Sequence, residues 1–276
     1  MDTIFICLPM FKVCYCEYVV MPESGRAKHP VGATDKTLRI IEELKRRDGA
    51  GITELADALD TSKATVHNHL STLQDHEYVV NENGTYRLGI RFLELGEYTK
   101  QQTKLLEVAK GEIDTLAEET GEIANLVIEE HGRATYIYIS KGDLAVNLDT
   151  HVGTSQYLHT SAVGKSLLAK MDEKQFEQVL SRHGLPAETT NTVTNEEKLH
   201  EELERIREEG VAFDGEERAE GIRCVAAPIT DDQDRPLGGV SVSGPSTRLK
   251  DERFCKEIPE KVQHVATVIG INTFYS

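Results

Sequence analysis

Basic side chains are scarce in this 276-residue sequence, which has 31 Lys and Arg residues against 47 Asp and Glu residues and a net charge of −16. Such a balance argues against nucleic-acid binding by the chain as a whole, because phosphate repels negative charge. The scarcity is uneven, since residues 26–100 hold 11 basic and 12 acidic side chains, whereas residues 101–276 hold 19 and 32. A basic face is therefore available to the first segment, while the acidic excess belongs to the second.

The sequence also lacks a cysteine framework and a clean apolar run. Three of its five cysteines lie within the first 16 residues and the other two stand alone, which argues against a disulfide scaffold and favours a cytoplasmic location. The first 20 residues are apolar, but Asp2 and Lys12 make this run unsuitable as a signal peptide or a membrane span. We therefore expect no membrane association. We also expect residues 1–30 to be an N-terminal extension, either disordered or a mis-assigned start ahead of Met21.

Residues 31–89 carry the element pattern of a winged helix-turn-helix domain. Apolar spacing predicts three helices, with N-caps at Thr34, at Thr53 and at Thr61 or Ser62. Residues 78–88 then hold two β-rich runs around Asn83-Gly84, a dipeptide typical of a tight hairpin turn. Three helices followed by a hairpin predict the winged form of this DNA-binding domain.

The third predicted helix has a face of short polar side chains. Val66, Leu70 and Leu73 share one side of the helix, and Asn68 points almost opposite. Short donors, acceptors and methyl groups suit base edges, whereas an ordinary solvated helix surface, which is the alternative, usually carries longer charged side chains. The candidate contacts to double-stranded DNA are Ser62, Lys63, Ala64, Thr65, His67, Asn68, Ser71, Thr72, Arg87 and Arg91. Among the basic residues, Lys63, Arg87 and Arg91 are candidates for phosphate contacts, together with Lys45, Arg46 and Arg47.

The remaining sequence alternates helical and strand-like segments. A linker helix is expected at residues 90–103, followed by a second domain at residues 104–276. Strands are predicted near residues 123–129, 134–140, 144–149, 222–230 and 236–243, and helices near 161–170, 173–182, 195–209 and 249–270. This order predicts an α+β domain whose helices pack on one side of a sheet.

Five motifs together resemble the IclR family of transcriptional regulators. They are SKATVHNHLSTL at 62–73, YRLG at 86–89, LHTSAVGKSLLA at 158–169, EGIRCVAAPI at 220–229 and GGVSVSGP at 238–245. The resemblance covers about residues 31–275. It implies a winged helix-turn-helix joined by a linker helix to a GAF-like effector-binding domain, in a homodimer or a dimer of dimers. Relatives often carry Arg at the position of Asn68, so the base preference at that position is not carried over.

The same resemblance implies a small-molecule pocket in the second domain. Its expected lining is Leu148, Leu158, Ala162, Val163, Asp214, Cys224, Ser241 and Ser243. The amides of Ala162 and Val163 would offer donors to a carboxylate, and the two leucines would form apolar walls. These groups suit a small organic acid as the effector.

Three alternatives for the second domain are weaker. Gly164-Lys165-Ser166 imitates the end of a phosphate-binding loop, but His159 stands where that motif needs glycine. Cys224 would make the protein a redox sensor only if its thiol were accessible with a low pKa, and a thiol enzyme only with a nearby base. No spacing pairs His151 or His159 with this cysteine. We therefore predict a metabolite-controlled DNA-binding regulator that is not an enzyme and holds no cofactor or metal.

Overall fold

The computed structural model describes residues 29–275, which form two compact units that divide between Leu95 and Gly96. The division falls inside the segment expected to be the linker helix. Most of the N-terminal extension expected at residues 1–30 lies outside the described residues. No helix within residues 29–275 is both long enough and apolar enough to cross a membrane.

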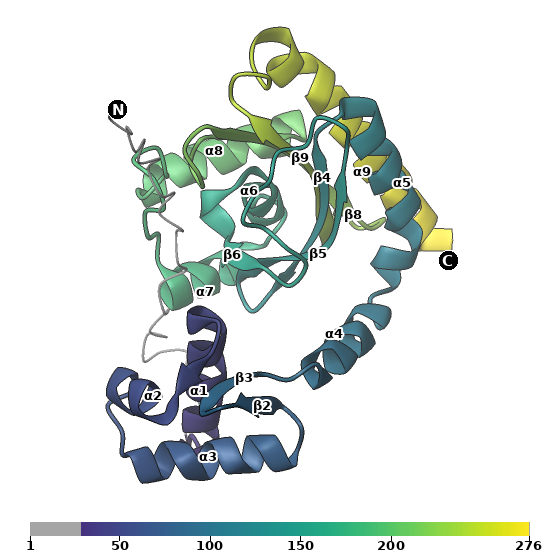
Figure 1. The fold of residues 1–276 in the computed structure, drawn as a ribbon. Coiled ribbons are helices and arrows are strands. Elements are labelled where there is room, and N and C mark those ends of the chain that lie inside the picture. The colour runs from purple at the N-terminus through teal and green to yellow at the C-terminus, as the bar shows by residue number, and fades with distance from the viewer. Residues whose placement is uncertain (1–28, 276) are drawn as a thin grey trace, which may run out of the picture. The chain divides into compact units, whose positions relative to one another are not determined.

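Residues 32–88 fold into three helices and a three-stranded antiparallel sheet (Figure 1). The elements are α1 (Gly32–Arg47), β1 (Ala50–Gly51), α2 (Ile52–Ala58), α3 (Lys63–Asp75), β2 (Val79–Glu82) and β3 (Thr85–Leu88), in the sheet order β1-β3-β2. Helix α4 (Arg91–Gln101) follows directly. The expected winged helix-turn-helix fold is confirmed.

Turn and capping chemistry shape this unit locally. Asn83 and Gly84 have φ values of 54° and 92°, the left-handed backbone that a two-residue hairpin turn requires. Ser62 caps α3 as expected, because its hydroxyl accepts a hydrogen bond from the Thr65 amide at 3.1 Å.

Two of the expected helix caps are wrong. Helix α1 begins two residues before Thr34, after Val31, without a side-chain cap. Helix α2 begins at Ile52, one residue before Thr53, and its N-cap position is Gly51. The Gly51 amide donates to the Glu54 carboxylate at 2.7 Å, so a side chain of the first turn does the capping. A carboxylate that reaches back from the first turn satisfies a free amide in place of an N-cap side chain.

The apolar stripe of α3 holds the recognition helix against the rest of its unit. Val66 and Leu70 are fully buried and Leu73 is almost so, as the sequence predicts. They join one hydrophobic cluster with Ile40 of α1 and Leu55 of α2. Burial of this stripe fixes which side of α3 faces solvent.

The second unit is built around a six-stranded antiparallel sheet of order β6-β5-β4-β9-β8-β7. Its strands are β4 (Ile123–Glu130), β5 (Arg133–Lys141), β6 (Ser155–Tyr157), β7 (Ala212–Gly215), β8 (Ile222–Thr230) and β9 (Pro236–Pro245). Its helices are α5 (Lys104–Thr120), α6 (Ala162–Leu168), α7 (Glu173–His183), α8 (Glu196–Glu209) and α9 (Ile258–Tyr275). A 3-10 turn, Leu158–Thr160, precedes α6, and a π turn, Arg253–Glu257, precedes α9.

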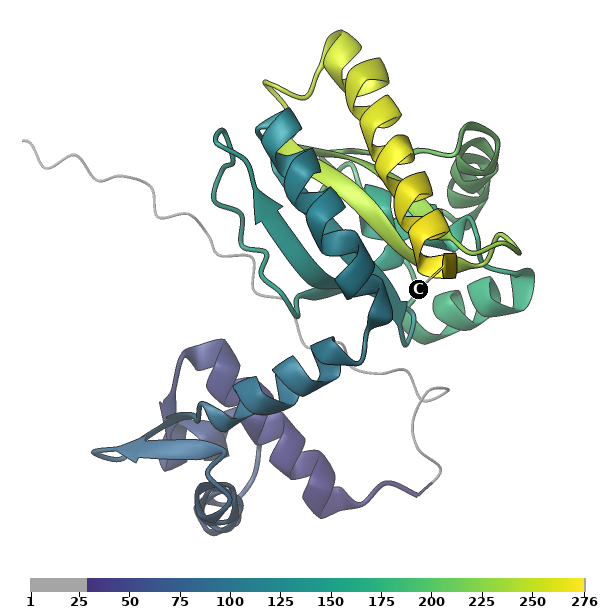
Figure 2. The same ribbon diagram turned by 90° about the vertical axis from the view of Figure 1, so that its right-hand side faces the viewer.

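The expectation that all helices pack on one side of the sheet is wrong. Helices α5 and α9 cover one face, and α6 to α8 lie over the other (Figures 1 and 2). Both faces of the central strands are apolar, so each face needs a cover. On β8, Val225 joins the cluster beneath α5 and α9, while the next residue, Ala226, joins the cluster beneath α6.

Two strands also differ from the sequence expectation. Residues 144–149 form no strand, and the third strand of this unit is β6, which pairs with the start of β5. Leu148 instead turns its side chain into a cavity, so the apolar alternation of this segment does not mark a sheet face. Strand β7 was not expected, because its four residues are too few to show a periodic pattern.

Candidate functional site

The exposed face of α3 presents most of the predicted DNA contacts. Lys63, Ala64, His67, Asn68 and Thr72 are exposed. Thr65 and Ser71 are half-buried at the edges of this face, and Ser62 is exposed at the helix start. The sequence prediction of a polar face opposite the buried stripe therefore agrees with the structure.

Hydrogen bonds separate the side chains that are free on this face from those that are engaged. The Ser62 hydroxyl lies 2.8 Å from the Thr65 hydroxyl, and the Thr72 hydroxyl donates to the Asn68 carbonyl at 3.0 Å. Within residues 29–275, the side chains of Lys63, His67 and Asn68 make no such bond. These three side chains are the ones most available to an external partner.

The candidate phosphate-binding cations have different surroundings. Arg46 and Arg47 both pair with the buried carboxylate of Glu43, whose pKa the Arg46 hydrogen bond holds below its usual value. Arg91 donates to the His76 carbonyl at 3.1 Å and to the Glu77 carboxylate at 3.2 Å.

Among the remaining candidates, Arg87 of β3 is exposed. No Asp or Glu of the described chain lies within ion-pair distance of its guanidinium. Arg87 therefore remains the cation of the wing best suited to a phosphate contact, while Arg91 helps to hold the start of α4.

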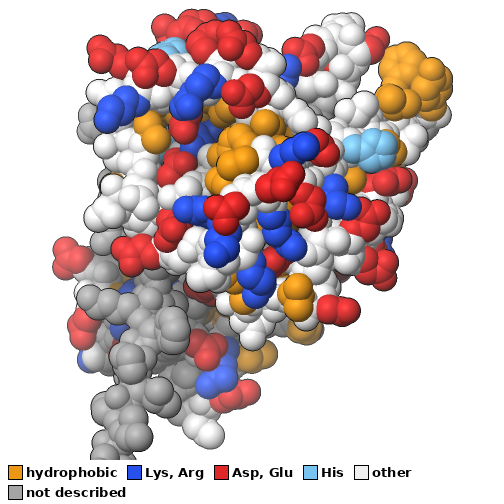
Figure 3. All heavy atoms as spheres, turned by 90° about the horizontal axis from the view of Figure 1, so that it is seen from above, with side chains coloured by type: hydrophobic (Ala, Val, Ile, Leu, Met, Phe, Trp, Pro, Cys, Tyr) orange, Lys and Arg blue, Asp and Glu red, His pale blue; other side chains and the backbone are white. Residues whose placement is uncertain are grey.

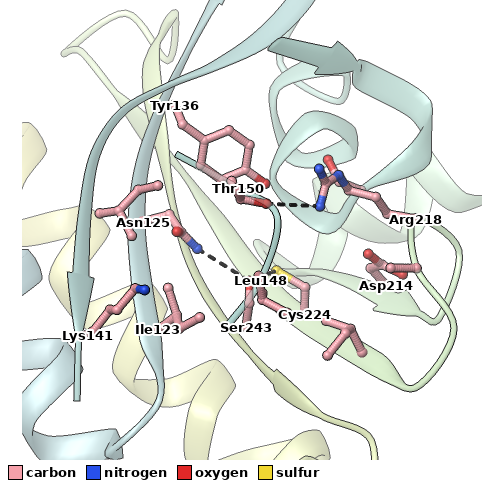
Figure 4. A pocket seen from close by; sticks show the side chains of 14 residues that line it. Ile123, Asn125, Tyr136, Lys141, Leu148, Thr150, Asp214, Arg218, Cys224 and Ser243 are labelled. Atoms are coloured by element: carbon pink, nitrogen blue, oxygen red, sulfur yellow. Dashed lines mark hydrogen bonds between the residues drawn. The ribbon is translucent and has the colours of Figure 1, made fainter. Parts of the chain in front are cut away.

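The second unit contains a partly open cavity between β4, β5, β8 and β9 and the segment that joins β5 to β6 (Figure 4). It leaves room of only about 30 Å³ for water-sized molecules. Its lining residues are Ile123, Asn125, Tyr136, Ile139, Lys141, Leu148, Thr150, Ser161, Asp214, Arg218, Ala219, Ile222, Cys224 and Ser243. The wall is mostly apolar, with a few polar groups that converge on it, which is the usual character of a small-molecule site.

Four of the eight predicted effector contacts line this cavity, namely Leu148, Asp214, Cys224 and Ser243. The lining does not include Leu158, Ala162, Val163 or Ser241, which are all buried in the packing around it. A β-carbon on Gly239 would lie 2.7 Å from the Cγ2 of Val163, so this valine packs directly on the sheet. At the start of α6, the cavity is lined by Ser161 instead.

A buried polar network forms the floor of the cavity. The Asn125 side-chain amide donates to the Ser241 hydroxyl at 3.1 Å and to the Ser243 hydroxyl at 3.3 Å. The Ser243 hydroxyl in turn donates to the Cys224 sulfur at 3.2 Å. Both serines therefore face the same side of β9, as their alternation predicts, and Ser241 supports the floor from behind the lining.

The environment of Cys224 opposes thiol chemistry. Its side chain is buried, and burial is the main cause that raises the pKa of the thiol to about 12. A redox-active or nucleophilic cysteine needs the opposite shift. His159 is held by the Pro186 carbonyl and His151 by its own turn, and neither lines the cavity. These observations weaken the redox-sensor and thiol-enzyme alternatives.

The cavity is lined by two cationic side chains, Arg218 and Lys141, that were not predicted from the sequence. The Arg218 guanidinium donates to the Thr150 hydroxyl at 3.2 Å, and Lys141 lies on the other side of the cavity (Figure 4). Across residues 29–275, no Asp or Glu lies within ion-pair distance of either side chain. On the face of the molecule shown in Figure 3, by contrast, Lys and Arg side chains lie among Asp and Glu side chains.

The acidic group of the cavity is Asp214. Burial raises its pKa to about 7, and the neighbouring negative charge of Glu217 adds to this effect. Its carboxylate accepts a hydrogen bond from the Glu217 amide at 2.7 Å. Asp214 is therefore largely uncharged at slightly acidic pH, which lowers its repulsion of an anion in the cavity.

A buried lysine fixes the segment that carries Arg218. The Lys165 ammonium group lies 2.6 Å from the Glu217 carboxylate and 3.0 Å from that of Glu202, and its side chain is fully buried. This pairing explains the Gly164-Lys165-Ser166 motif without a bound phosphate. It also positions the chain next to Arg218, since Glu217 precedes that residue.

Sequence signals existed for some of the lining residues that were missed. Asn125 is a lone amide in the otherwise apolar start of β4, and Arg218 lies four residues after Asp214. No comparable signal marks Tyr136 or Thr150, whose part in the cavity depends on tertiary contacts. No group of three or more His, Cys, Asp or Glu side chains within residues 29–275 is placed to hold a metal ion.

Comparison with known proteins gives the same two-part division. Residues 33–82 match the profile described as the IclR helix-turn-helix domain, and residues 98–271 match the profile of the bacterial transcriptional regulator IclR C-terminal domain. The chain is 34% identical over 256 residues to a protein of Halobacterium salinarum described as "Probable HTH-type transcriptional regulator ArcR", covering 91% of this chain and 97% of that one.

Two further relatives extend the comparison. The transcriptional repressor IclR of Escherichia coli K12 is 31% identical over 228 residues, covering 81% of this chain and 83% of that one. The crystal structure of the Thermotoga maritima IclR protein superposes with a TM-score of 0.71 at 27% identity, covering 88% of this chain and 98% of that one.

Proposed function

The chain belongs to the IclR family of transcriptional regulators, and from that premise we propose that a small organic acid in the cavity of the second unit controls its operator binding. It is a DNA-binding regulator with an effector-binding domain, not an enzyme. The observation that carries the proposal is the guanidinium of Arg218, which enters a mostly apolar cavity and forms no salt bridge with an acidic side chain of the described chain. We also propose that the protein acts in the cytoplasm as a homodimer or a dimer of dimers.

An acid fits this cavity for electrostatic reasons. A partly buried guanidinium loses hydration and regains stability from an anionic partner, and its planar donors match a carboxylate. The Ser243 hydroxyl and the Asn125 amide can orient the rest of the ligand, while Ile123 and Leu148 exclude water. The effector must bind the DNA-bound and free states with different affinity, and a coupling of about 1–3 kcal/mol is typical.

A panel of organic acids tests the proposal. Each acid is first screened for thermal stabilisation of the full-length protein, and each hit is then added to an operator titration. We expect at least one acid to shift operator affinity by about fivefold or more. If no acid stabilises the protein or changes operator affinity, control by an organic acid is wrong.

Asn68→Ala is expected to reduce discrimination between operator and random DNA, because Asn68 is exposed opposite the buried stripe of α3. Loss of one good base contact costs about 1–3 kcal/mol of discrimination. Arg87→Ala is the matched control, because loss of a phosphate contact should weaken both duplexes alike and lower the salt dependence. Competition assays at several salt concentrations measure both effects. Equal losses on the two duplexes for Asn68→Ala would contradict a base-reading role.

Acid binding is expected to weaken as the pH rises through 7. The pKa of Asp214 is about 7 in the free protein, and a bound carboxylate nearby would raise it further, because the anion favours the protonated form. Below pH 7 Asp214 is already protonated and affinity should be constant. Above pH 7 binding must take up a proton, so affinity should fall by at most about tenfold per pH unit.

Calorimetric titration of the acid between pH 6 and pH 8.5 checks this dependence. Asp214→Asn keeps the oxygen that accepts the Glu217 amide and should flatten the profile. The other groups around Asp214 are Lys165, Glu217, Arg218, Tyr136 and Cys224. Tyr136 and Cys224, with pKa values of about 12, do not titrate in this range. A pH dependence that is unchanged in Asp214→Asn would exclude Asp214 as its source.

A further inference from the structure

The two unpaired cations of the cavity lie on opposite sides of it. Lys141 is at the end of β5, where it pairs with Ile123 of β4, and Arg218 is in the segment between β7 and β8. Figure 4 shows both side chains directed toward the space between them. Lys141 has an exposed side chain and Arg218 a half-buried one, so the cavity has one cation near solvent and one deeper.

The surface between the two cations carries no other charge. It is formed by the Asn125 amide, the Ser243 hydroxyl and the Cys224 thiol, with Ile123 and Leu148 as apolar walls. The nearest acidic group in the lining, Asp214, lies on the Arg218 side (Figure 4). A ligand with one acidic group can neutralise only one of the two cations, and the other cation then remains without a partner.

We propose that the effector of this protein is a short-chain dicarboxylate, with one carboxylate on Arg218 and the other on Lys141. This inference rests on the proposed function and narrows its ligand class. The planar guanidinium suits a carboxylate held in a fixed orientation, whereas the lysine ammonium is a flexible point charge that can reach diacids of different length. The polar floor between them then faces the middle of the ligand.

Entry of a diacid requires the cavity to enlarge. Room of about 30 Å³ suits roughly two water molecules. The segment of residues 142–154 supplies Leu148 and Thr150 to the lining. It forms no helix or strand, so it is the part of the cavity wall that can move to admit a ligand. A carboxylate that replaces the Thr150 hydroxyl on Arg218 would release the contact between this segment and the cavity.

Calorimetric titration of the full-length protein with matched acids tests the inference. The diacids are malonate, succinate and glutarate, and the monoacids of equal chain length are propionate, butyrate and valerate, all at one ionic strength. At least one diacid should bind about fivefold to tenfold more tightly than its matched monoacid, as one added charge-assisted contact implies. Lys141→Met should abolish this preference, because it removes the partner of the second carboxylate and so weakens diacid binding more than monoacid binding. Lys174→Met, which removes an exposed charge of α7 outside the cavity, should keep the preference.

The possible outcomes separate this inference from the proposed function. Monoacids that bind and shift operator affinity would support control by an organic acid. If, in addition, no diacid binds more than about twofold more tightly than the monoacid of equal chain length, the dicarboxylate inference is wrong. A diacid preference that persists in Lys141→Met also overturns the inference. If neither series binds nor changes operator affinity, acid control fails and the inference fails with it. Circular dichroism spectra of the variants establish that each is folded.

Discussion

Lys165→Met is expected to lower the free energy of unfolding of the second unit by about 3–5 kcal/mol, because it leaves a buried carboxylate without its counter-charge. Lys165 is fully buried, and its ammonium group is the basic partner of Glu217. Burial already raises the pKa of Glu217, and the lysine opposes that shift. Without Lys165, the carboxyl of Glu217 must either stay charged in a dry site or take up a proton.

Denaturant unfolding of the full chain, followed by circular dichroism, measures this loss. Glu202→Gln is the matched control and should cost less, because the Glu202 side chain is 23% exposed and Lys165 keeps its pairing with Glu217. The double variant Lys165→Met with Glu217→Met should recover much of the stability, since it removes both charges together. A change below about 1 kcal/mol for Lys165→Met would show that the buried pair is not needed to hold this segment.

Arg218→Met is expected to abolish the response of operator binding to the acid effector. The variant keeps the length and apolar contacts of the side chain and removes the guanidinium. Loss of a charge-assisted contact from a half-buried guanidinium should weaken acid binding by about 30-fold to 100-fold. Operator binding without effector should be unchanged, because Arg218 lies in the second unit and the candidate DNA contacts lie in the first.

Operator titration with and without the acid measures this effect, and calorimetry measures acid binding directly. Arg218→Lys is the conservative control and should recover part of the response, because it restores the charge without the planar fork of donors. A full response in Arg218→Met would place the acid elsewhere. Loss of operator binding in the absence of the acid would indicate a structural role for Arg218 instead.

Local chemistry explains why the first unit could be predicted well from the sequence. The turn at Asn83-Gly84 depends on the backbone of two residues, and the stripe of Val66, Leu70 and Leu73 depends on the helical repeat. Neither feature needs information from distant parts of the chain. The errors at the starts of α1 and α2 arose where a backbone or carboxylate contact replaced the expected side-chain cap.

The second unit was harder to predict because its cavity depends on contacts between distant segments. Family motifs placed the backbone amides of Ala162 and Val163 at the cavity, but they carry no information on which residue at the start of α6 reaches the lining, and that residue is Ser161. The contact of Arg218 with Thr150 spans 68 residues, and no periodicity or spacing rule predicts it. The apolar alternation around Leu148 reflects its place in the cavity wall, which sequence alone does not distinguish from a strand.

The strand order of the second unit has a consequence for folding during synthesis. β4 lies between β5 and β9, so its pairing is complete only when Pro236–Pro245 has been made, and the bond from Asn125 to Ser241 joins residues 116 apart. The last strand of the first unit ends at Leu88, so this unit is complete in the growing chain and can fold before that point. A chain that ends before Pro236 would keep every element of the DNA-binding unit and lack the strand that joins β4 to β8. Premature termination there would leave the DNA-binding unit attached to an effector-binding domain whose sheet is incomplete.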